Sequence, residues 1–554
     1  MPRRVEVLPV RDFTGGLNYN ADAFQLQDSQ VTDCLNVDFD PNGGFRRRDC
    51  AQAINLTAIA DATPTAVKPK NLWTFTSGDG NYKHICVQAG NDFAYGTGGN
   101  FTTVNPDALA TTGIMNAAQA HDLLYVQRNA EQVAFKWSGA ATTVLADSHG
   151  AYNDNFAAPA GGKMPKAKYI CHHLNYLFHA NINEAGTMQR DRVRFSHPFS
   201  DLHASKGAED YRTNDWFFVG RGDGDEITGM VSFQKELVIF KNNSVWVLRG
   251  YDAQSFQLEN VSRKVGAVHQ RAIAVGDEGV YFFSWPNGLQ LYDGSSVRDL
   301  WYPLTPITSP NGNGTTIDQL SADPNYVINT TVGYVNQRCW VSLTLGGDTV
   351  NKITFVFDPR LGRGGGWTRY NLPLGAYTTL HPPSGDREWF AVSDAATGFV
   401  LKLHTLNGGF KDRLSASGGV GVDTGVTSWT FTKWYDLGNA ALVKRWKHPI
   451  IVCDSASDVT LTADVFRDYD LTAPTRSFNL DIVGPPAPTT WGGSTWGGGT
   501  WSTAINAAAQ SIERGGLLGR GTAIAMKVSG PATGDIPWSV NAITLKYIPK
   551  RIRS

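Results

Sequence analysis

Short apolar segments alternate with turns rich in Gly, Asn and Asp along most of the chain, and pairs of these segments recur as hairpins. The clearest copies are Lys235–Gly250, with Asn242-Asn243 at the bend, and Glu278–Gly294, with Asn287-Gly288 at the bend. Asn-Gly and Asn-Asn pairs can adopt the positive φ of tight hairpin turns, while Val, Ile, Phe, Tyr and Trp suit a pleated, half-buried surface. The pattern therefore predicts an all-β protein made of repeated hairpins.

Weaker copies extend the repeat from residue 91 to residue 403. The mean spacing of their central apolar residues is about 50 residues, which is in the range of propeller blades. Individual steps run from 31 to 61 residues, so a β-propeller of six or seven blades is predicted over residues 56–405. A run of unrelated hairpins in two sandwiches is the alternative. The central residues of the seven copies are Phe93, Leu124, Leu177, Val238, Tyr281, Trp340 and Phe390.

The segments on either side of this repeat differ from it in composition. Residues 1–55 hold one short alternating segment and then loop-like runs, which predicts an assembly arm that packs on its own propeller or on a neighbouring subunit. Residues 406–427 are rich in Gly and Ser and predict a linker. Residues 428–554 hold six further strand segments, several with alternating apolar and polar residues, which predicts a C-terminal β-sandwich.

Three tryptophans, Trp491, Trp496 and Trp501, stand five residues apart in a Gly-rich segment of this C-terminal region. Glycine prevents a stable helix there, so the segment is expected to be a loop or ribbon that carries indoles. Exposed together, the indoles would form an interface or a sugar-stacking patch. Alternatively they fold back over the sandwich, since large aromatic side chains are usually buried.

The charge of the chain limits its partners. The 554 residues have a formal net charge of −1, which implies no global attraction to nucleic acid or to an anionic membrane. The strongest local charge is Arg46-Arg47-Arg48. These guanidinium groups could clamp nucleic-acid phosphate, or pair with carboxylates on another subunit or within the chain. The ion pairs are preferred because the chain has no general basic character.

Signatures of catalysis and of cofactor binding are largely absent from the sequence. No phosphate-binding loop, His-Glu-x-x-His motif or Gly-x-Ser-x-Gly motif occurs. His172 and His173 are adjacent, so on a strand they would face opposite sides and would not share a metal. The acidic turn Gly220–Glu226 lacks the spacing of a calcium loop and is expected to be solvated. We therefore predict no enzymatic activity and no catalytic, cofactor-binding or metal-binding residues.

Cysteine use and the N-terminal residues bear on the compartment. The six cysteines are scattered without a Cys-x-x-Cys pair, which favours buried thiols over disulfides. Residues 1–7 carry positive charge without the apolar core of a signal peptide, and no stretch approaches the length of a membrane span. We expect synthesis in a cytoplasm.

Several segments resemble those of a known family. They are Phe13-Thr14-Gly15-Gly16-Leu17-Asn18, Leu35-Asn36-Val37-Asp38, Phe45-Arg46-Arg47-Arg48, Ile273–Phe283 with Gly288–Gly294, Lys433–Gly438 and the Trp-rich ribbon. On these residues the chain resembles the tail nozzle or hub proteins of short-tailed bacteriophages, of the tail tubular protein B type.

The resemblance implies a structural virion protein without cofactor or enzymatic turnover. It implies a homohexameric ring of propeller subunits below the head-to-tail adaptor, near tail fibre or spike proteins. The ring would enclose a channel that retains the packaged DNA and releases it on infection, and the protein would be located in the phage tail. The alternative is a receptor-binding or carbohydrate-binding propeller, of the lectin or glycosidase kind, that uses Trp491, Trp496 and Trp501 to stack on sugars.

Overall fold

The computed structural model describes residues 5–22, 25–60, 67–78, 80, 83–104, 113–150, 152, 163–198, 208–309, 320–362, 364–381, 386–395, 398–405, 411–417, 420–439, 441–484, 509–514, 517–531 and 536–549. These residues are almost entirely strand and turn, so the predicted all-β class is confirmed. Short helical segments occur at η1 (Gln270–Ala272), η2 (Tyr302–Leu304), α2 (Thr305–Thr308) and η4 (Pro324–Asn329). No helix of this described part is long and apolar enough to cross a membrane.

Seven sheets, each with a four-stranded antiparallel core, follow one another along the chain and are here called the seven-sheet unit. Val, Ile, Phe and Tyr fill their middle strands, which are buried on both faces because sheets pack on either side. The first sheet contains β7 (Pro69–Thr76), β8 (Lys83–Ala89), β9 (Asp92–Gly96) and β10 (Thr102–Val104), and the second contains β11 (Asn116–Ala120), β12 (Leu123–Arg128), β13 (Gln132–Trp137) and β14 (Thr142–Val144). The third sheet contains β17 (Lys166–His173), β18 (Tyr176–Glu184), β19 (Thr187–Phe195) and β20 (Trp216–Phe218). The fourth sheet contains β21 (Ile227–Phe233), β22 (Glu236–Lys241), β23 (Val245–Arg249) and β24 (Gln257–Ser262). A short parallel pair, β15 (Ala146–Asp147) and β16 (Lys163–Met164), lies between the second and third sheets in the sequence.

The last three sheets complete this unit, and the seventh includes a strand from the N-terminal segment. Strand β6 (Cys50–Ala53) lies antiparallel to β35 and parallel to β36. The fifth sheet contains β25 (Ile273–Val275), β26 (Val280–Ser284), β27 (Gly288–Tyr292) and β28 (Val297–Asp299). The sixth contains β29 (Thr331–Val335), β30 (Arg338–Leu343), β31 (Ile353–Asp358) and β32 (Gly366–Tyr370). The seventh contains β33 (Leu374–Leu380), β34 (Glu388–Ser393), β35 (Val400–Thr405), β6, β36 (Asp412–Ser417) and β37 (Val420–Thr424).

The seven central residues of the predicted repeat lie in seven different sheets. Six of them lie on the second strand of their sheet, as Val238 does on β22 and Tyr281 on β26. Phe93 instead lies on β9, the third strand, because β8 and β9 are similarly apolar. This offset by one strand accounts for the short predicted step after Phe93.

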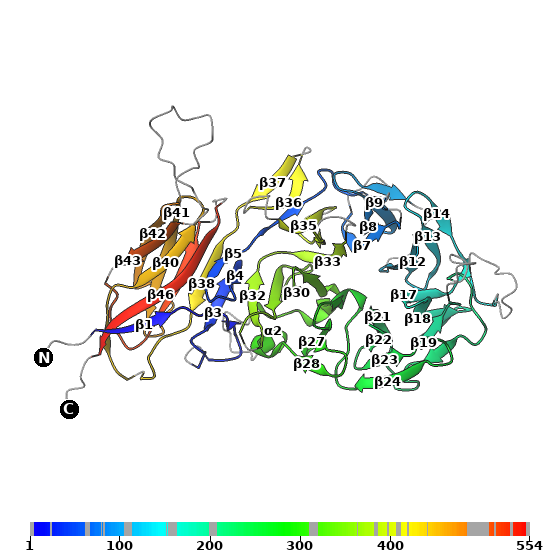
Figure 1. Cartoon of the computed structure of the whole chain (residues 1–554), viewed down its shortest axis with the longest axis horizontal. Helices are drawn as coiled ribbons and strands as arrows, with labels where there is room; N and C mark the ends of the chain where they lie inside the picture. Colours follow the sequence, from blue (N-terminus) through cyan, green and yellow to red (C-terminus); the bar gives the residue numbers. More distant parts are fainter. Residues whose placement is uncertain are drawn as a thin grey trace.

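The first strands of the sheets contact one another in chain order. β7, β11, β17, β21, β25, β29 and β33 each contact the next, and β33 also contacts β7. In Figure 1 the sheets accordingly follow the colour sequence from blue through cyan and green to yellow around one part of the molecule. Amide side chains link neighbours: Gln88 Nε2 donates to the carbonyl of Gly113 (2.9 Å) while its Oε1 accepts from the N–H of Met115 (2.8 Å). Gln127 bonds in the same way to Pro165 and Ala167 of the following sheet.

The remaining strands form two larger sheets, here called the two-sheet unit. Buried residues from both sheets, such as Ile451 and Leu545 on one and Leu461 and Val528 on the other, belong to one hydrophobic cluster, so the sheets pack face to face. The eight-stranded sheet contains β1 (Glu6–Val10), β4 (Val37–Phe39), β5 (Phe45–Arg47), β39 (Lys444–Trp446), β40 (Ile450–Ser455), β43 (Ala509–Arg514), β44 (Gly519–Gly521) and β46 (Trp538–Pro549). The six-stranded sheet contains β2 (Gly16–Leu17), β3 (Gln30–Leu35), β38 (Ser428–Thr432), β45 (Ile524–Gly530), β41 (Val459–Arg467) and β42 (Arg476–Ile482).

Two predicted boundaries differ from this arrangement. Residues 1–55, predicted to be an arm, contribute five strands to the two-sheet unit: β1 pairs with β46, β3 with β38 and β5 with β46. Residues 406–427, predicted to be a linker, contain the β36–β37 hairpin, which extends the seventh sheet. The N-terminal strands pair with strands from the other end of the chain, and β36 pairs with the distant β6 as well as with the adjacent β37. The local composition therefore does not indicate these sheets.

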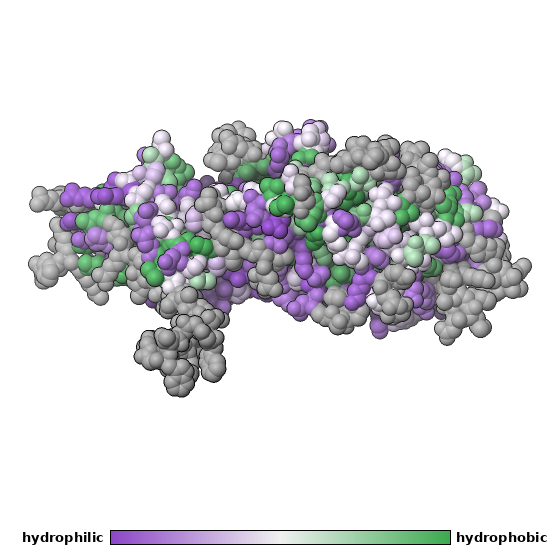
Figure 2. Space-filling model, turned by 90° about the horizontal axis from the view of Figure 1, so that it is seen from above, coloured by the Kyte–Doolittle hydropathy of each residue, from purple (hydrophilic) through white to green (hydrophobic). Residues whose placement is uncertain are grey.

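A single hydrophobic core runs from one unit into the other. The cluster that fills the two-sheet unit also includes Trp301 near the fifth sheet and Phe355 and Trp367 of the sixth. The rings of Trp301 and Trp367 meet edge to face with centroids 5.1 Å apart. In the view of Figure 2 hydrophilic and hydrophobic residues are interspersed over the visible face of both units.

Candidate functional site: the junction between the two units

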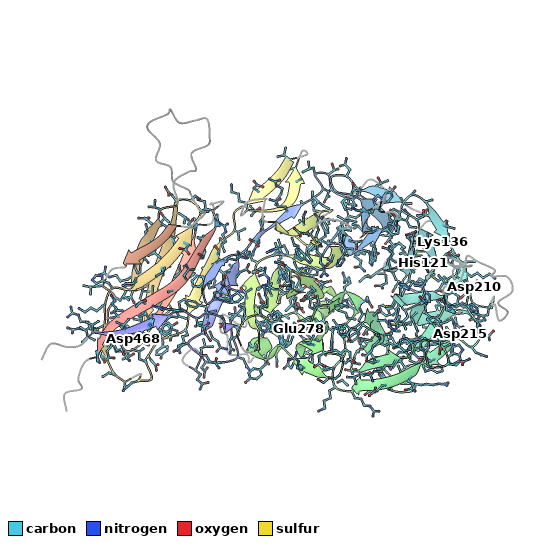
Figure 3. The ribbon with its side chains drawn as sticks, viewed as in Figure 1. His121, Lys136, Asp210, Asp215, Glu278 and Asp468 are labelled. Atoms are coloured by element: carbon cyan, nitrogen blue, oxygen red, sulfur yellow. The ribbon has the colours of Figure 1, made fainter. Side chains whose placement is uncertain are left out.

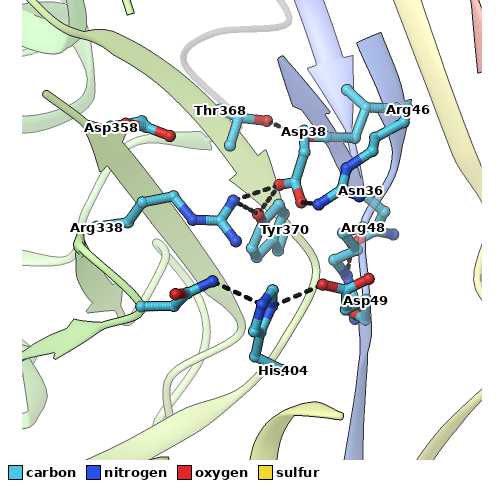
Figure 4. Close-up of polar contacts among 12 residues, drawn as sticks. Asn36, Asp38, Arg46, Arg48, Asp49, Arg338, Asp358, Thr368, Tyr370 and His404 are labelled. Carbon is cyan, nitrogen blue, oxygen red and sulfur yellow. Dashed lines mark hydrogen bonds and ion pairs between the residues drawn. The ribbon is translucent and has the colours of Figure 1, made fainter. Parts of the chain in front are cut away.

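Asn36, between β3 and β4, takes part in the polar contacts that join the two units. Figure 4 shows it beside Arg48, close to the contacts of Asp38 with Arg338 and Tyr370. It is fully buried and has a φ of 54°, a conformation that asparagine tolerates better than most residues. Its Nδ2 donates to Asn371 Oδ1 (2.6 Å) and to the carbonyl of Thr427 (2.7 Å). Its Oδ1 accepts from Arg48 Nε (2.9 Å) and from the N–H of Asn371 (3.2 Å). The amide therefore uses all its hydrogen-bonding positions at this junction.

Asp38, on β4, ties the N-terminal segment to the sixth sheet. Its Oδ1 is 2.8 Å from Arg338 Nη1 and accepts a hydrogen bond from the hydroxyl of Tyr370. Burial of Asp38 raises the pKa of its carboxyl, but Arg338 and Arg46 outweigh that effect and hold the pKa below its ordinary value. The carboxylate is therefore charged at neutral pH and held by paired donors, as a buried charge requires.

The three arginines Arg46, Arg47 and Arg48 have different surroundings. Arg46 has 48% of its side chain exposed and lies 4.0 Å from Asp38. Arg47 is buried, and its guanidinium donates to the carbonyls of Val426 (3.2 Å) and Ile536 (3.5 Å). Successive side chains on β5 point to opposite faces of the sheet, so Arg46 points to the exposed face and Arg47 to the buried one.

Arg48 is buried and forms an ion pair within the chain. Its Nη1 donates to Asp412 Oδ1 (2.9 Å), and its Nη2 donates to Asp412 Oδ2. Burial lowers the pKa of Arg48, but Asp412 outweighs this effect, and the net pKa lies above its ordinary value. Of the three candidate residues for assembly or DNA contact, Arg46 is the one whose side chain reaches the surface of this chain.

The glycine-rich motif before β3 fits closely against the sixth sheet. Phe13 is fully buried and meets Phe45 edge to face, with centroids 5.1 Å apart. Gly16 has a φ of 61°, and a Cβ there would lie 2.7 Å from the backbone N and O of Trp367. The motif therefore requires glycine at this position, because no side chain fits between the backbones.

His404 connects the junction to the surface of the seventh sheet. Its Nδ1 lies 2.6 Å from Asp49 Oδ2, and its Nε2 lies 2.6 Å from Asn336 Nδ2. With this orientation of the amide, Nε2 accepts a hydrogen bond from Asn336, so Nδ1 carries a proton and faces the carboxylate of Asp49. His404 has a φ of 54° where the register of β35 against β6 shifts. The imidazole is therefore held from both sides in one orientation.

A groove of about 1300 Å³ opens beside His404 over the fifth, sixth and seventh sheets. Its walls come from the turns after β25 and β29, the start of β34 and the end of β35. Two aromatic rings line it, Tyr334 and Trp389. The Tyr334 ring stacks on Tyr281 with centroids 5.8 Å apart, and its hydroxyl donates to Asp277 Oδ2 at 3.2 Å.

A smaller cavity of about 220 Å³ lies among the first strands of the sheets. Its lining includes Trp73, Asn116, Val332 and Tyr377, which come from four different sheets. Arg271 reaches it and donates to the carbonyls of Lys70 and Ile328, both at 2.9 Å.

The acidic turn Gly220–Glu226 is bonded to the chain's own donors. Asp223 pairs with the buried Lys241, whose Nζ lies 2.5 and 2.6 Å from its two oxygens. Asp225 accepts from the N–H groups of Asn242 (3.2 Å) and Asn243 (2.9 Å). These two asparagines lack the positive φ that the Asn-Asn pair predicts, because Asp225 satisfies their N–H groups in another conformation. Residues Arg221 to Gly224 are exposed, as the sequence predicts for a solvated turn, and the carboxylates of the turn also fasten the neighbouring hairpin.

The other sequence candidates do not come together. His172 and His173 end β17, and His173 Nδ1 lies 2.8 Å from Ser232 Oγ. Burial lowers the pKa of His173 to about 4. Across the described residues no group of three or more His, Cys, Asp or Glu side chains could hold a metal. In Figure 3 His121, Lys136, Asp210 and Asp215 lie at the far end of the seven-sheet unit, Glu278 lies nearer the junction and Asp468 lies in the two-sheet unit. All six cysteines are buried thiols. Trp491, Trp496 and Trp501 lie outside the described residues.

The groove and its histidine were not identified from the sequence. Asp49, Asn336 and His404 are far apart along the chain. The pairing of β6 with β35 brings Asp49 to His404, and the packing of the sixth sheet on the seventh brings Asn336. The one local signal is the turn Asn336-Gln337, in which both residues have positive φ. Such a turn predicts a hairpin but not the side chains that surround it.

Comparisons with known proteins give weak structural likenesses. No protein-family model and no curated protein sequence matches the chain. Among solved structures the chain is similar to BBS1N, from its crystal structure in complex with ARL6DN, with 10% identity, a TM-score of 0.37 and coverage of 65% of this chain and 98% of that one. It is similar to the major Malassezia sympodialis allergen Mala s 1, with 10% identity, a TM-score of 0.29 and coverage of 52% and 91%. It is also similar to the extracellular domain of the putative hybrid two component system BT4673 from B. thetaiotaomicron, with 8% identity, a TM-score of 0.33 and coverage of 64% and 39%.

Proposed function

We propose that this chain is a structural component of the tail of a short-tailed bacteriophage, of the nozzle or hub type. In this role it assembles as a ring below the head-to-tail adaptor, retains the packaged DNA and forms part of the ejection channel. The observation that favours this function most is the junction. Segments on which the chain resembles that family, Phe13–Asn18, Leu35–Asp38 and Phe45–Arg48, converge there.

In a subunit of a tail ring, the seven-sheet unit and the two-sheet unit must keep a fixed position relative to each other. The junction meets this need because buried ion pairs and a continuous hydrophobic core join the two units. Breaking either contact would leave a buried charge or a cavity, both of which are strongly unfavourable. The two units therefore act as one body in the proposed ring.

We further propose that the seven-sheet unit is a seven-bladed β-propeller and that the two-sheet unit is its appended β-sandwich. Seven four-stranded sheets, consecutive contacts among their first strands and the contact between β33 and β7 support this architecture. Strand β6 would close the ring of blades by joining the N-terminal segment to the last blade. Full closure leaves few open strand edges, which suits a protein packed against copies of itself.

The charge balance suits a channel that must release its DNA. A wall that held phosphates through many Lys and Arg side chains would bind DNA tightly and resist ejection. The chain has 49 Lys and Arg against 50 Asp and Glu, so contact with DNA would be weak and independent of sequence. The proposed partners are five further copies of the chain in a hexamer, the head-to-tail adaptor and tail fibre or spike proteins.

Electron microscopy of the purified protein, alone and mixed with the adaptor encoded near its own gene, tests this function. We expect rings with sixfold symmetry that bind the adaptor end on. A protein that remains monomeric in the presence of the adaptor, and never sediments with particles, would contradict the proposal.

The exposed Arg46 offers a finer test of assembly. We expect Arg46→Glu to weaken ring formation, because it reverses the charge of the surface arginine at the junction. Arg298→Glu is the matched control, since Arg298 lies on β28 of the fifth sheet and has 57% of its side chain exposed. Equal ring formation by both variants would remove Arg46 from the interface.

A further inference from the structure

We propose that the groove over the fifth, sixth and seventh sheets binds an oligosaccharide. This site goes beyond the proposed structural role, and its success or failure is independent of whether the chain forms a ring. The groove of about 1300 Å³ exceeds the roughly 300–1,000 Å³ typical of pockets for one small ligand. Its size therefore fits an elongated ligand of several linked units.

Two aromatic side chains are held in place to receive such units. Trp389 lies on β34, where its indole meets the imidazole of His404 at 75° with centroids 6.1 Å apart. Tyr334 is fixed by its stack on Tyr281 and by its hydrogen bond to Asp277. Aromatic faces pack against the C–H faces of sugar rings, and a rigid ring loses little entropy on binding.

The backbone on the fifth-sheet side is shaped to admit the Tyr334 ring. A Cβ at Gly276 would lie 2.6 Å from Tyr334 Cε2 and 2.7 Å from Tyr281 Cε2. The missing side chain lets both rings approach the turn after β25. Glycine at this position thus maintains the aromatic wall of the groove.

Planar polar side chains supply the hydrogen bonds that sugars require. The Asn336 amide has two donor and two acceptor positions, and its contact with His404 uses one donor. His404 is fixed in turn by Asp49, so the amide is presented in a defined orientation. Sugar hydroxyls both donate and accept, and adjacent hydroxyls match the paired atoms of amide, carboxylate and guanidinium groups.

The charges of the lining favour a sugar over a phosphate-bearing polymer. Three carboxylates, of Asp277, Asp386 and Glu388, face two cations, of Arg387 and Lys402. Lys402 is already paired with Glu388 at 2.6 Å. With no excess of positive charge, the groove lacks the field that nucleic acid or another polyphosphate needs.

Binding of the full-length protein to an array of bacterial cell-surface polysaccharide fragments, followed by calorimetric titration of the strongest one, tests the proposal. We expect Trp389→Ala to lower the affinity about tenfold or more, as loss of a central aromatic anchor does. Asp386→Asn and Arg387→Ala alter exposed rim residues, so they should keep the fold and lower the affinity severalfold. Each variant is first compared with the parent by thermal unfolding.

The matched control is Trp429→Ala, because Trp429 is a half-buried indole on β38 of the two-sheet unit. The Trp429→Ala variant should bind the same polysaccharide fragment with an affinity within about twofold of that of the parent protein. No binding of any fragment by the parent protein would overturn the proposal. So would binding that neither Trp389→Ala nor the two rim variants weaken, or the capture at this groove of peptides from a random library in place of glycans.

Discussion

Arg48 and Asp412, which lie 364 residues apart in the sequence, form a buried two-pronged ion pair at the junction. Asp412 Oδ1 also accepts a hydrogen bond from the N–H of Ala51 (3.1 Å). The pair thus fixes the start of β36 against the start of β6 and holds both to Asn36 through Arg48 Nε. One guanidinium thereby joins the N-terminal segment, the seventh sheet and the residues that lead into the two-sheet unit.

Removal of Arg48 is expected to destabilise the protein severely. Arg48→Ala leaves the carboxylate of Asp412 buried without its partner, and such losses cost about 3–5 kcal/mol. Denaturant unfolding followed by tryptophan fluorescence measures the change. Arg46→Ala, in the adjacent position, is the control, and its half-exposed side chain should cost less than about 1 kcal/mol.

A double-mutant cycle with Asp412→Asn separates the ion pair from the other contacts of Arg48. The two changes should be strongly non-additive, because either one alone breaks the same pair. Additive effects would show that Arg48 acts through Asn36 and the carbonyl of Asp49 instead.

Gly276→Ala is expected to destabilise the packing between the fifth and sixth sheets. The new methyl group would collide with the rings of Tyr334 and Tyr281. Neither ring moves easily, because Tyr281 is fully buried and Tyr334 is stacked on it and bonded to Asp277. Overpacking of this kind costs about 1–3 kcal/mol. Gly364→Ala is the control, since a Cβ at Gly364 would meet nothing within 4 Å. Equal unfolding midpoints for both variants would be inconsistent with the close packing at Gly276.

The repeat could be read from the sequence because a hairpin is a local structure. Val238 and Tyr281 lie on the second strands that their apolar runs predict. In the first sheet the repeat points to Phe93 on the third strand, because β8 and β9 are similarly apolar and periodicity cannot distinguish them.

The N-terminal strands and the groove could not be read in this way. β3 and β5 find their partners at the other end of the chain, in β38 and β46, so no local pattern indicates the pairing. Asp412 lies in a Gly/Ser-rich segment whose composition predicts a coil, but the ion pair to Arg48 anchors it as a strand. The groove needs side chains from three sheets, and only the completed fold brings them together.

His179 is expected to make the protein less stable as the pH falls. It is fully buried: its Nδ1 accepts from Gln127 Nε2 (3.1 Å), and its Nε2 donates to the hydroxyl of Tyr211 (2.8 Å), which donates to the carbonyl of Ala208 (3.0 Å). Burial, with a smaller effect of Arg194, lowers the pKa of His179 from 6.5 to about 3. Between these two pH values the unfolded chain binds a proton at His179 and the folded chain does not. The contribution of His179 to the free energy of unfolding is therefore fully present above pH 6.5 and is lost as the pH falls below that value.

The size of this effect follows from the two pKa values of His179. From neutral or higher pH, above the ordinary pKa of 6.5, down to about pH 5 the loss is about 2 kcal/mol. We expect His179→Gln to flatten the pH dependence of the free energy of unfolding by this amount, whatever its stability at neutral pH. His149→Gln, in an exposed turn, serves as the control and should keep the parent slope. An unchanged slope in His179→Gln would contradict the buried neutral imidazole.

Deletion of the N-terminal segment distinguishes an external arm from an integral part of the fold. A chain that begins at Asn55 lacks β1 to β6, so β46, β38 and β35 each lose a paired neighbour and Asp412 loses Arg48. We expect this chain to lose its cooperative thermal unfolding and its near-ultraviolet circular dichroism. A chain that begins at Asp12 lacks only the edge strand β1 and should remain folded with a lower midpoint. An Asn55 chain that unfolds at the parent midpoint would show that the segment is an arm dispensable for folding.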